Sequence, residues 1–548
     1  MKQPGAKGNK RGDPLPRNLA LWVGIVAYAV YLLTLSPGVS WEHHSEDSGD
    51  LITAAWVLGI PHPTGYPLFT MLGWIWSHIV ALGSVAWRMN AFSALWGAMA
   101  AGVTVRATWS SFHLLSEETR GRITRGGMAV AACASGLLLA FATDVWSLSV
   151  VTEVYTMGLF FTSLVSWILI ELLNLSKDEN QREEELSKRR TKLIIFLGLG
   201  WGFSLTNHLT SLFLLPGIVL VLFFSGLKPK AGELLKGVLF FILPLLLYLY
   251  LPIRSMMNPP LDWGNPETFD NFVWVVTGQQ FRKLMFTLLP YHMLHQVMRY
   301  SSVPAELAVP GALAAGLGII KLLLGRSRGV ILLMIYSLTL VASSLFYLAS
   351  YFIWDPEGYL LPMIWAASLW VGWSIVLLTS VPEALVKAGR IIAILLLIAA
   401  PVAGLVGHWQ DVDLSGNYEA MRFGQESFDA FEQDALMLEM RYERAFTLWY
   451  YREVEYADTR DDVAIVFVEH ATFDWGLDLL KRKYPELILP DAVITEPGKE
   501  TATAMWIIKN NVDLRPVYSG ALIDDLVEEG YRFEADGLIF RVLPPDTR

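Results

Sequence analysis

Acidic residues and histidines are concentrated in one short stretch of the chain, residues 41–62. The stretch reads Trp-Glu-His-His-Ser-Glu-Asp-Ser-Gly-Asp-Leu-Ile-Thr-Ala-Ala-Trp-Val-Leu-Gly-Ile-Pro-His, with four carboxylates, three histidines and no Lys or Arg. Folding does not require such a cluster, and a carboxylate there could act as a general base that takes a proton from an acceptor hydroxyl. Asp47 and Asp50 are the candidates for this catalytic role.

Two other interpretations of this stretch remain open. Asp47 could cap a helix, with Asp50 in its first turn, where both acids would favour the helix electrostatically. Alternatively, the histidines and acids could bind a divalent metal, because imidazole and carboxylate ligands suit zinc and manganese. The metal ligands would come from His43, His44, Glu46 and Asp47. The spacing matches no metal motif such as His-Glu-x-x-His, so we expect no metal and no other cofactor.

Basic residues are rare in the loops on the same side of the predicted membrane, so Arg254, Arg282 and Lys283 stand out. Arginine binds phosphate through a planar fork of donors. We therefore expect Arg254 and Arg282, together with His208, to bind a phosphate group of the substrate. Contact with lipid headgroups is the alternative.

Polar and aromatic residues near the ends of other apolar runs complete the candidate site. An acid beside an aromatic ring could hydrogen-bond to a sugar while the ring stacks on it, although aromatic residues also line membrane interfaces for other reasons. The residues that we expect to contact a sugar or an acceptor are His62, Glu153, Tyr155, Asn207, Asp262, Trp263 and Asp355.

The composition indicates the class of fold that must position these candidate residues. Of the 548 residues, 53% are hydrophobic and 17% charged, and the mean hydropathy is +0.41. Soluble domains carry about 25% charged residues, so the sequence predicts a polytopic α-helical membrane protein. A span needs about 20 apolar residues, and a scan finds about 11 candidates. They lie near 19–36, 88–110, 127–143, 154–174, 193–206, 209–225, 237–253, 304–324, 329–350, 359–379 and 390–407.

The distribution of charge predicts the orientation, since Lys and Arg stay on the cytoplasmic side. With the N-terminus inside, the cytoplasmic segments hold 22 Lys and Arg, and the outer segments hold four. An odd number of spans then places the tail outside. We expect an integral protein of the bacterial inner membrane with a basic cytoplasmic N-terminus (1–18), a transmembrane catalytic domain (19–407) and an acidic extracytoplasmic α/β domain (408–548).

The tail is predicted to be a small soluble α/β domain with a partly parallel sheet, because apolar strands alternate with helical patterns. Strands are expected at Ala435–Leu438 and Val463–Val468, and helices at Ala445–Tyr456 and Trp475–Lys483. Further apolar segments lie at Ala504–Ile508, Val517–Tyr518 and Leu538–Val542. Residues 411–548 have a net charge of −15, which excludes nucleic acid as a partner.

A short helix is expected to begin in the acid-rich stretch. The apolar residues Leu51, Ile52, Ala54, Ala55 and Leu58 recur at helical spacing, while the two aspartates share the other face. This pattern predicts a helix in the membrane interface with both carboxylates directed towards water.

Four blocks of the sequence, in order, resemble a family of membrane proteins that includes a eukaryotic protein O-mannosyltransferase and bacterial relatives. The first block is residues 47–69, from Asp-Ser-Gly-Asp to Gly-Tyr-Pro-Leu-Phe, and the second is Glu-Val-Tyr at 153–155. The third is Gly-Phe-Ser-Leu-Thr-Asn-His-Leu-Thr at 202–210, and the fourth is Leu-Pro-Ile-Arg-Ser at 251–255, followed by Asn-Pro-Pro-Leu-Asp-Trp-Gly-Asn-Pro at 258–266. The resemblance implies a glycosyltransferase of the GT-C superfamily, which uses a polyprenyl-phosphate sugar. It also implies that Asp47 is the base and that metal is commonly dispensable. Relatives often have Glu where this chain has Asp50.

The resemblance and the residues together predict transfer of a sugar from a polyprenyl-phosphate donor to an acceptor hydroxyl, on the outer face and with inversion. The acceptor would be a protein, a lipid or a glycan, and membrane lipids would surround the enzyme. The alternative is a transporter or flippase for a lipid-linked glycan, with Asn207, His208 and Asp355 on its pathway. Transporters commonly contain internal repeats, and none is present here. A sensor or scaffold is a third possibility, which the acid-rich stretch disfavours.

Overall fold

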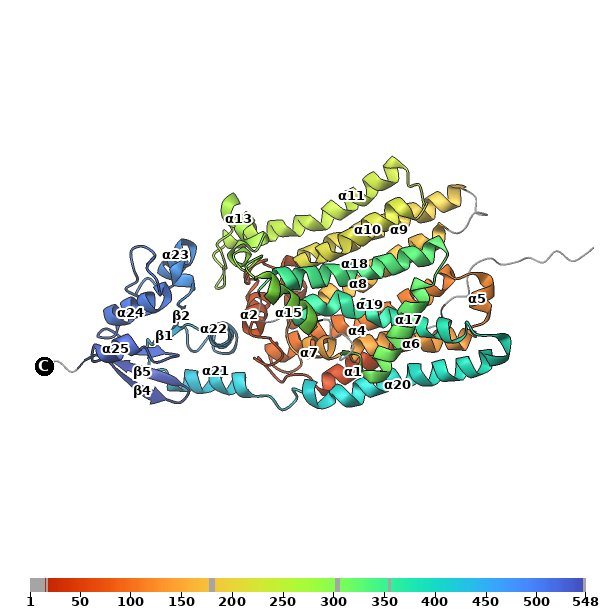
Figure 1. The fold of residues 1–548 in the computed structure, drawn as a ribbon. Helices are drawn as coiled ribbons and strands as arrows, with labels where there is room; N and C mark the ends of the chain where they lie inside the picture. The colour runs from red at the N-terminus through yellow and green to blue at the C-terminus, as the bar shows by residue number, and fades with distance from the viewer. Residues whose placement is uncertain (1–14, 16–17, 177–182, 301–305, 353–355, 546–548) are drawn as a thin grey trace, which may run out of the picture.

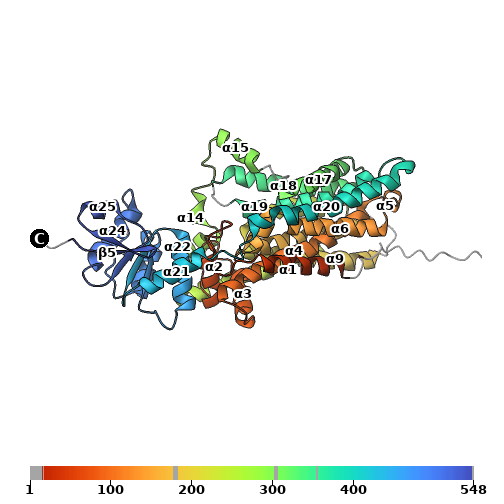
Figure 2. The ribbon, with the colours of Figure 1, turned by 90° about the horizontal axis from the view of Figure 1, so that it is seen from below.

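The computed structural model describes residues 15, 18–176, 183–300, 306–352 and 356–545. Most helices lie side by side in one long bundle, and the strands form a sheet beyond one end of that bundle (Figures 1 and 2). The acid-rich stretch lies at the end of the bundle that faces the sheet, where α2 approaches α22 (Figure 2).

A helix lies at each of the eleven predicted apolar runs. These helices are α1 (Leu19–Leu33), α4 (Val85–Ser111), α6 (Arg125–Ala140), α8 (Tyr155–Leu175), α9 (Glu183–Asn207), α10 (Leu215–Phe224), α11 (Ala231–Leu245), α17 (Ala308–Leu323), α18 (Arg328–Ser350), α19 (Glu357–Leu378) and α20 (Val386–Val412). Shorter helices connect them: α2 (Ser48–Val57), α3 (Pro67–Ile79), α5 (Glu117–Gly121), α7 (Thr143–Ser149), α12 (Tyr250–Ser255), α13 (Phe269–Val276), α14 (Gln279–Arg282) and α15 (Pro290–Tyr300).

Length and composition identify fewer spans than the sequence scan. Among the described residues, five helices are long and apolar enough to cross a membrane, or six if α6 and α7, which meet at a bend of 62°, form one broken span. The five are Tyr155–Leu175, Ala231–Ser255, Arg328–Ser350, Glu357–Leu378 and Glu383–Val412. Several spans are thus present, and the number eleven stays a prediction.

The tail contains the partly parallel sheet that was predicted. Its strands are β1 (Leu436–Glu439), β2 (Ala464–Phe467), β3 (Val517–Ser519), β4 (Arg532–Asp536) and β5 (Ile539–Leu543). The order is β2-β1-β3-β5-β4, with β1 parallel to β2 and β3, and β5 antiparallel to β3 and β4. The helices around it are α21 (Glu419–Ala430), α22 (Tyr442–Tyr450), α23 (Asp474–Lys483), α24 (Lys499–Asn511) and α25 (Asp524–Glu528). The apolar segment at 504–508 lies in α24.

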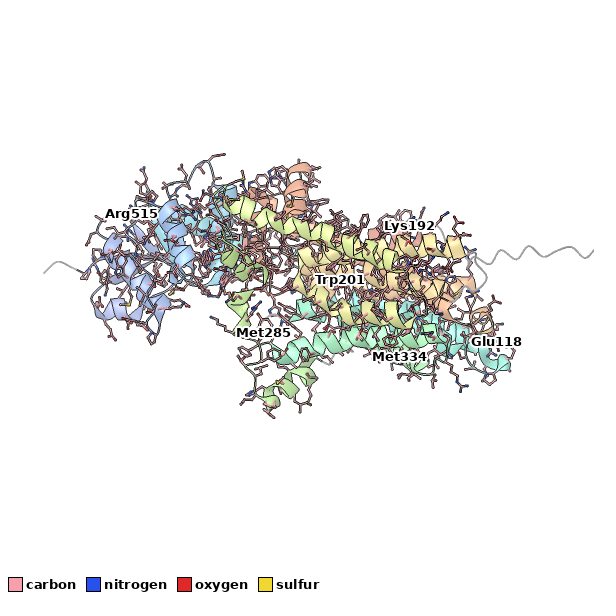
Figure 3. All side chains as sticks on the ribbon, turned by 90° about the horizontal axis from the view of Figure 1, so that it is seen from above. Glu118, Lys192, Trp201, Met285, Met334 and Arg515 are labelled. Atoms are coloured by element: carbon pink, nitrogen blue, oxygen red, sulfur yellow. The ribbon has the colours of Figure 1, made fainter. Side chains whose placement is uncertain are left out.

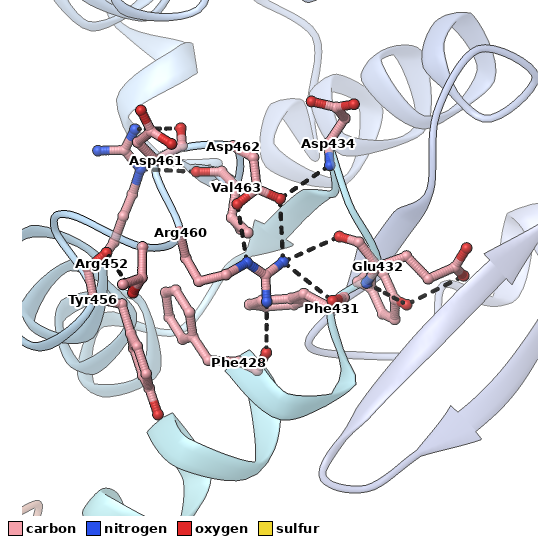
Figure 4. A network of polar contacts seen from close by, with 12 residues as sticks. Phe428, Phe431, Glu432, Asp434, Arg452, Tyr456, Arg460, Asp461, Asp462 and Val463 are labelled. Carbon is pink, nitrogen blue, oxygen red and sulfur yellow. Dashed lines mark hydrogen bonds and ion pairs between the residues drawn. The ribbon is translucent and has the colours of Figure 1, made fainter.

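Arg460 fixes the first helix of the tail to the sheet. Its guanidinium donates to the carbonyl oxygens of Phe428 and Phe431, at the end of α21, at 2.9 and 3.1 Å (Figure 4). It also donates to Asp462, two residues before β2. Because α21 follows the last helix of the bundle, this network orients the sheet relative to the bundle.

The tail and the bundle share one hydrophobic core around α2. Apolar residues of α2, α3 and α4 belong to the same cluster of buried side chains as residues of α22 and β2. The indole of Trp41 donates to Glu443 O and Thr447 Oγ1, both at 2.9 Å. Gly49 lies directly against Phe446, where a Cβ atom would overlap the backbone. The tail is therefore packed on the acid-rich stretch.

A short parallel bridge fixes the chain after α2. The amide of Ile60 donates to Leu261 O at 2.8 Å, and the amide of Trp263 donates to Ile60 O at 3.1 Å. Between them Asp262 is 1% exposed and accepts a hydrogen bond from Ser255 Oγ at 2.9 Å, while Oδ1 has no partner among the described residues. Burial raises the pKa of Asp262 to about 6.

Gly49→Ala is expected to lower the midpoint of thermal unfolding, although alanine favours helix formation. The added methyl group overlaps the backbone of Phe446, and overpacking of this kind costs about 1–3 kcal/mol. Gly416→Ala is the control, because no atom lies within 4 Å of a Cβ at that position. Equal midpoints for the two variants would contradict the close packing of α22 on α2.

Asp262→Asn is expected to flatten the pH dependence of stability between about pH 4 and pH 6. The folded protein binds the Asp262 proton more tightly than the unfolded chain, so stability falls as pH rises through this window. A rise in pKa from about 4 to about 6 corresponds to about 3 kcal/mol. Unfolding midpoints measured across this range should diverge from wild type, with the variant more stable above pH 6. Asp270→Asn, on the exposed start of α13, should instead run parallel to wild type.

Candidate active site

A buried carboxyl group, Asp50, holds His62 in place. Residue Leu58 ends α2 in the left-handed conformation, which turns the chain back towards the first turn of the helix. The backbone amide of His62 lies 2.9 Å from Asp50 Oδ2, and its ring Nδ1 lies 2.7 Å from the same oxygen. Burial raises the pKa of Asp50, and the hydrogen bonds from His62 oppose this rise.

The prediction that both carboxylates face water is wrong for Asp50. Its side chain is completely buried, because α22 covers one side of α2 and His62 closes over the first turn. Helical periodicity identified the apolar face of α2 correctly but gave no information on what covers the other face.

Asp47 is the accessible acid of the pair. Its side chain is 36% exposed, and Oδ2 lies 3.3 Å from His62 Nε2. It occupies the N-cap position of α2, but its side chain makes no capping hydrogen bond, so the capping interpretation does not describe it. Tyr66 OH lies 2.9 Å from the same ring nitrogen of His62. We refer to Asp47, Asp50, His62 and Tyr66 as the Asp–His cluster.

Tyr66 was not identified from the sequence. It is the fourth residue after His62 in the segment Pro-His-Pro-Thr-Gly-Tyr-Pro (61–67). The three prolines and the glycine mark a turn, and a turn brings residues at this spacing together. That signal was present, although it does not specify a hydrogen bond between the two rings.

Aromatic rings continue from the Asp–His cluster into the bundle. The rings of Tyr66 and His208 stack, with centroids 5.7 Å apart and an angle of 7° between their planes. The centroid of the Tyr155 ring lies 5.2 Å from that of His208. Burial and the neighbouring His62 lower the pKa of His208 to about 3. His208 is therefore neutral near pH 7, and it can contribute a hydrogen bond to a phosphate but no positive charge.

Arg254 is engaged by the backbone of α2. Its Nε donates to Leu58 O at 2.5 Å, and Nη2 donates to Val57 O at 3.0 Å. These carbonyls end α2, where a cation is favourable. Arg282, at the end of α14, is exposed, and neither arginine forms an ion pair with an acid in the described part of the chain. Arg282 is thus the freer of the two predicted phosphate ligands.

Trp263 is unsuited to stacking on a sugar in this arrangement. It is 1% exposed and packs edge-on against His470, with ring centroids 4.4 Å apart. Its indole donates to Gln280, which in turn donates to Glu469 of the tail. The tail thus covers the ring of Trp263, and its predicted contact with a sugar stays a prediction. Asp262 is equally buried.

The remaining predicted residues lie around the aromatic rings. Asn207 is buried and donates to Val154 O at 3.0 Å, which joins α9 to the start of α8. Glu153 is 4% exposed, and Tyr155 lies between His208 and Tyr359. Asp355 lies outside the described residues. His43, His44 and Glu46 border a cavity beside the cluster, and across the described ranges no group of three or more His, Cys, Asp or Glu is arranged to hold a metal ion.

Residues 47–231 match the protein family described as Protein O-mannosyl-transferase TMEM260 N-terminal domain. The chain is 29% identical to Protein O-mannosyl-transferase TMEM260 of Mus musculus over 270 residues, which are 48% of this chain and 34% of that protein. It is 24% identical to the Dictyostelium discoideum protein of the same name over 343 residues, 59% of this chain and 38% of that protein. The chain thus spans about a third of the length of these relatives.

Two crystal structures of ArnT from Cupriavidus metallidurans share the fold. The structure bound to undecaprenyl phosphate has a TM-score of 0.56 and the apo structure one of 0.59, each with 13% sequence identity and 96% of this chain covered. The alignments cover 97% and 96% of the ArnT chains, so the likeness extends over both the bundle and the tail. The matched family region begins at Asp47, within the Asp–His cluster. The resemblance inferred from the sequence is confirmed: residues 47–231 are similar to the N-terminal domain of the TMEM260 protein O-mannosyl-transferases, and the chain has the fold of ArnT.

Proposed function

We propose that the protein is a membrane glycosyltransferase that moves a sugar from a polyprenyl-phosphate donor to an acceptor hydroxyl on the outer face of a bacterial inner membrane. The observation that carries this proposal is the accessible carboxylate of Asp47, held 3.3 Å from a histidine that a buried acid fixes in place. The names of the relatives support a transferase, and ArnT bound to undecaprenyl phosphate supports this class of donor.

The reaction requires a base, an anomeric carbon and a leaving phosphate in line. The acceptor oxygen attacks the anomeric carbon as its proton passes to Asp47, and the bond between that carbon and the phosphate oxygen breaks. Configuration inverts in this single displacement, and polyprenyl phosphate leaves. His62 keeps Asp47 oriented, since Asp50 fixes one ring nitrogen and the other faces Asp47 and Tyr66.

The leaving phosphate needs positive charge close to the membrane surface. Arg282 supplies most of it in this proposal, because its guanidinium is exposed and in no ion pair with a described acid. Arg254 contributes through its remaining donor while it caps α2, and neutral His208 contributes a hydrogen bond. The distribution of Lys and Arg supports a cytoplasmic N-terminus and an extracytoplasmic tail in this proposal.

A protein hydroxyl is the acceptor that we propose, because both matched relatives are named as protein O-mannosyl-transferases. Mannose is accordingly the first sugar to test. Purified protein supplied with polyprenyl-phosphate mannose and a peptide rich in Ser and Thr should release polyprenyl phosphate and glycosylate the peptide. Release without any glycosylated product would leave only hydrolysis and refute this acceptor.

Asp47→Asn should abolish transfer while the protein remains folded. The amide retains the shape of the side chain but cannot accept the proton, and loss of a general base costs about 100- to 10,000-fold in rate. The control is Asp411→Asn, an exposed acid near the end of α20. Full transfer by Asp47→Asn, with a wild-type unfolding midpoint, would exclude Asp47 as the base.

Arg282→Ala and Arg254→Lys should affect different properties. Loss of a charged hydrogen bond to phosphate costs about 1.5–3 kcal/mol, so Arg282→Ala should raise the KM for the donor about tenfold or more. Arg254→Lys cannot span the carbonyls of Val57 and Leu58 together, so it should mainly lower the unfolding midpoint. Donor titrations and melting curves separate the two effects. A large rise in KM for Arg254→Lys alone would assign the phosphate to Arg254.

A further inference from the structure

A cavity of about 410 Å³ lies beside the Asp–His cluster, between three parts of the chain that are distant in sequence. The acid-rich stretch contributes residues from Trp41 to Glu46, the first turns of α7 contribute Asp144, and the start of α19 contributes Glu357. Its acids are Glu42, Glu46, Asp144 and Glu357, and no Lys or Arg is among the described residues that line it. The cavity is therefore strongly negative.

Asp144 forms no ion pair with a basic residue in the described part of the chain. Its side chain is 9% exposed, and its carboxylate has no hydrogen-bond partner among the described residues. A further acid, Glu306, lies next to Asp144, since the backbone amide of Asp144 donates to Glu306 Oε2 at 2.9 Å. Placing carboxylates together in a buried position is costly unless one of them takes up a proton or a cation joins them. A buried acid that lines a cavity without a partner in the described part of the chain is therefore a group that a cationic ligand can pair with.

The cavity is coupled to the Asp–His cluster through two short connections. Glu46, in its wall, directly precedes Asp47. Glu357, in the opposite wall, directly precedes Gly358, which packs so tightly on Tyr155 that a Cβ would overlap the ring. Tyr155 in turn contacts His208. A group bound in the cavity would thus contact Glu46, the residue that directly precedes the proposed base.

The volume of the cavity favours a large organic cation over a bare metal ion as its ligand. One water molecule occupies about 30 Å³ in the liquid, so a cavity of about 410 Å³ is far larger than a bare ion requires. The volume admits a long side chain that ends in an ammonium or guanidinium group. Glu42 and His44 are exposed at its rim, which leaves a path from solvent. His44 Nε2, at 3.4 Å from Glu357 Oε1, marks one position that a cation can occupy.

We propose that this cavity binds a lysine or arginine side chain of the polypeptide acceptor and so selects a Ser or Thr that lies near a basic residue. The peptide nature of the ligand rests on the proposed function, while the charge preference rests on the cavity itself. The nitrogen cation replaces water around Asp144 and Glu357, and the acceptor hydroxyl then lies towards Asp47.

Binding of fluorescent peptides in the absence of donor tests this proposal. Each peptide carries one Thr and, at a nearby position, Lys, Arg, Gln or Glu. Fluorescence anisotropy should show the Lys and Arg peptides binding wild-type protein about tenfold more tightly than the Gln peptide, which corresponds to about 1.4 kcal/mol. The Glu peptide should bind most weakly. Equal affinity for the Lys and Gln peptides would overturn the proposal.

Two sets of variants assign the preference to this cavity. The double variant Asp144→Asn with Glu357→Gln should bind the Lys peptide as weakly as the Gln peptide. The control is Glu117→Gln with Glu118→Gln, at the end of the bundle far from the tail, where Figure 3 labels Glu118. Glu357→Lys alone should reverse the preference towards the Glu peptide. A double variant that folds and keeps the preference overturns the assignment, as does displacement of the Lys peptide by free glucosamine at equal concentration, which would identify an amino sugar as the ligand.

Failure of this inference is distinguishable from failure of the proposed function. Asp47→Asn should bind the Lys peptide as wild type does and yet transfer no sugar. If wild-type protein prefers basic peptides but transfers no sugar, the assignment of the cavity stands and the proposed glycosyltransferase function is refuted. If wild-type protein transfers sugar efficiently to peptides of any charge, the proposed function stands and the assignment of the cavity is refuted.

Discussion

The arrangement of the candidate site depends on the burial of one carboxyl group. Asp50 has no access to water, and an acid in that position is tolerated only with hydrogen-bond donors close by. His62 supplies two of them, from its backbone and its ring. The turn after α2 must therefore return His62 to the first turn of that helix, and the bridge between Ile60 and Asp262 holds it there. The geometry around the proposed base follows from this one requirement.

Two aspartates three residues apart have acquired different roles from their surroundings. Asp50 is enclosed, so it acts on structure by orienting an imidazole, while Asp47 is 36% exposed and directly follows Glu46, which lines a cavity. Pairs of acids in contrasting environments are a recurrent feature of enzyme sites. Asn207 and His208 are also buried, Asn207 with a hydrogen bond to Val154 O and His208 in a stack with Tyr66. A transport pathway would require such residues to line an open channel.

The sequence predicted the parts of the structure that depend on local pattern. The apolar runs matched eleven helices, the spacing of Leu51 to Leu58 matched α2, and the alternation in the tail matched a partly parallel sheet. The errors concern contacts over long distances in the chain. Asp50 was expected to face water, because nothing near it in the sequence indicates that α22 covers it. Nothing near Trp263 in the sequence indicates that the loop after β2 covers its ring.

The packing of the tail on α2 determines when the site can form during synthesis. Trp41 donates its indole hydrogen to Glu443, a residue 402 positions later in the chain. The acid-rich stretch is made early, and α2 keeps one uncovered face until α22 has been translated. Asp47 and His62 thus acquire their final surroundings only when the tail folds against them. A chain that stopped before α22 would contain the helices of the bundle and still lack the finished site, which makes the proposed activity dependent on the tail.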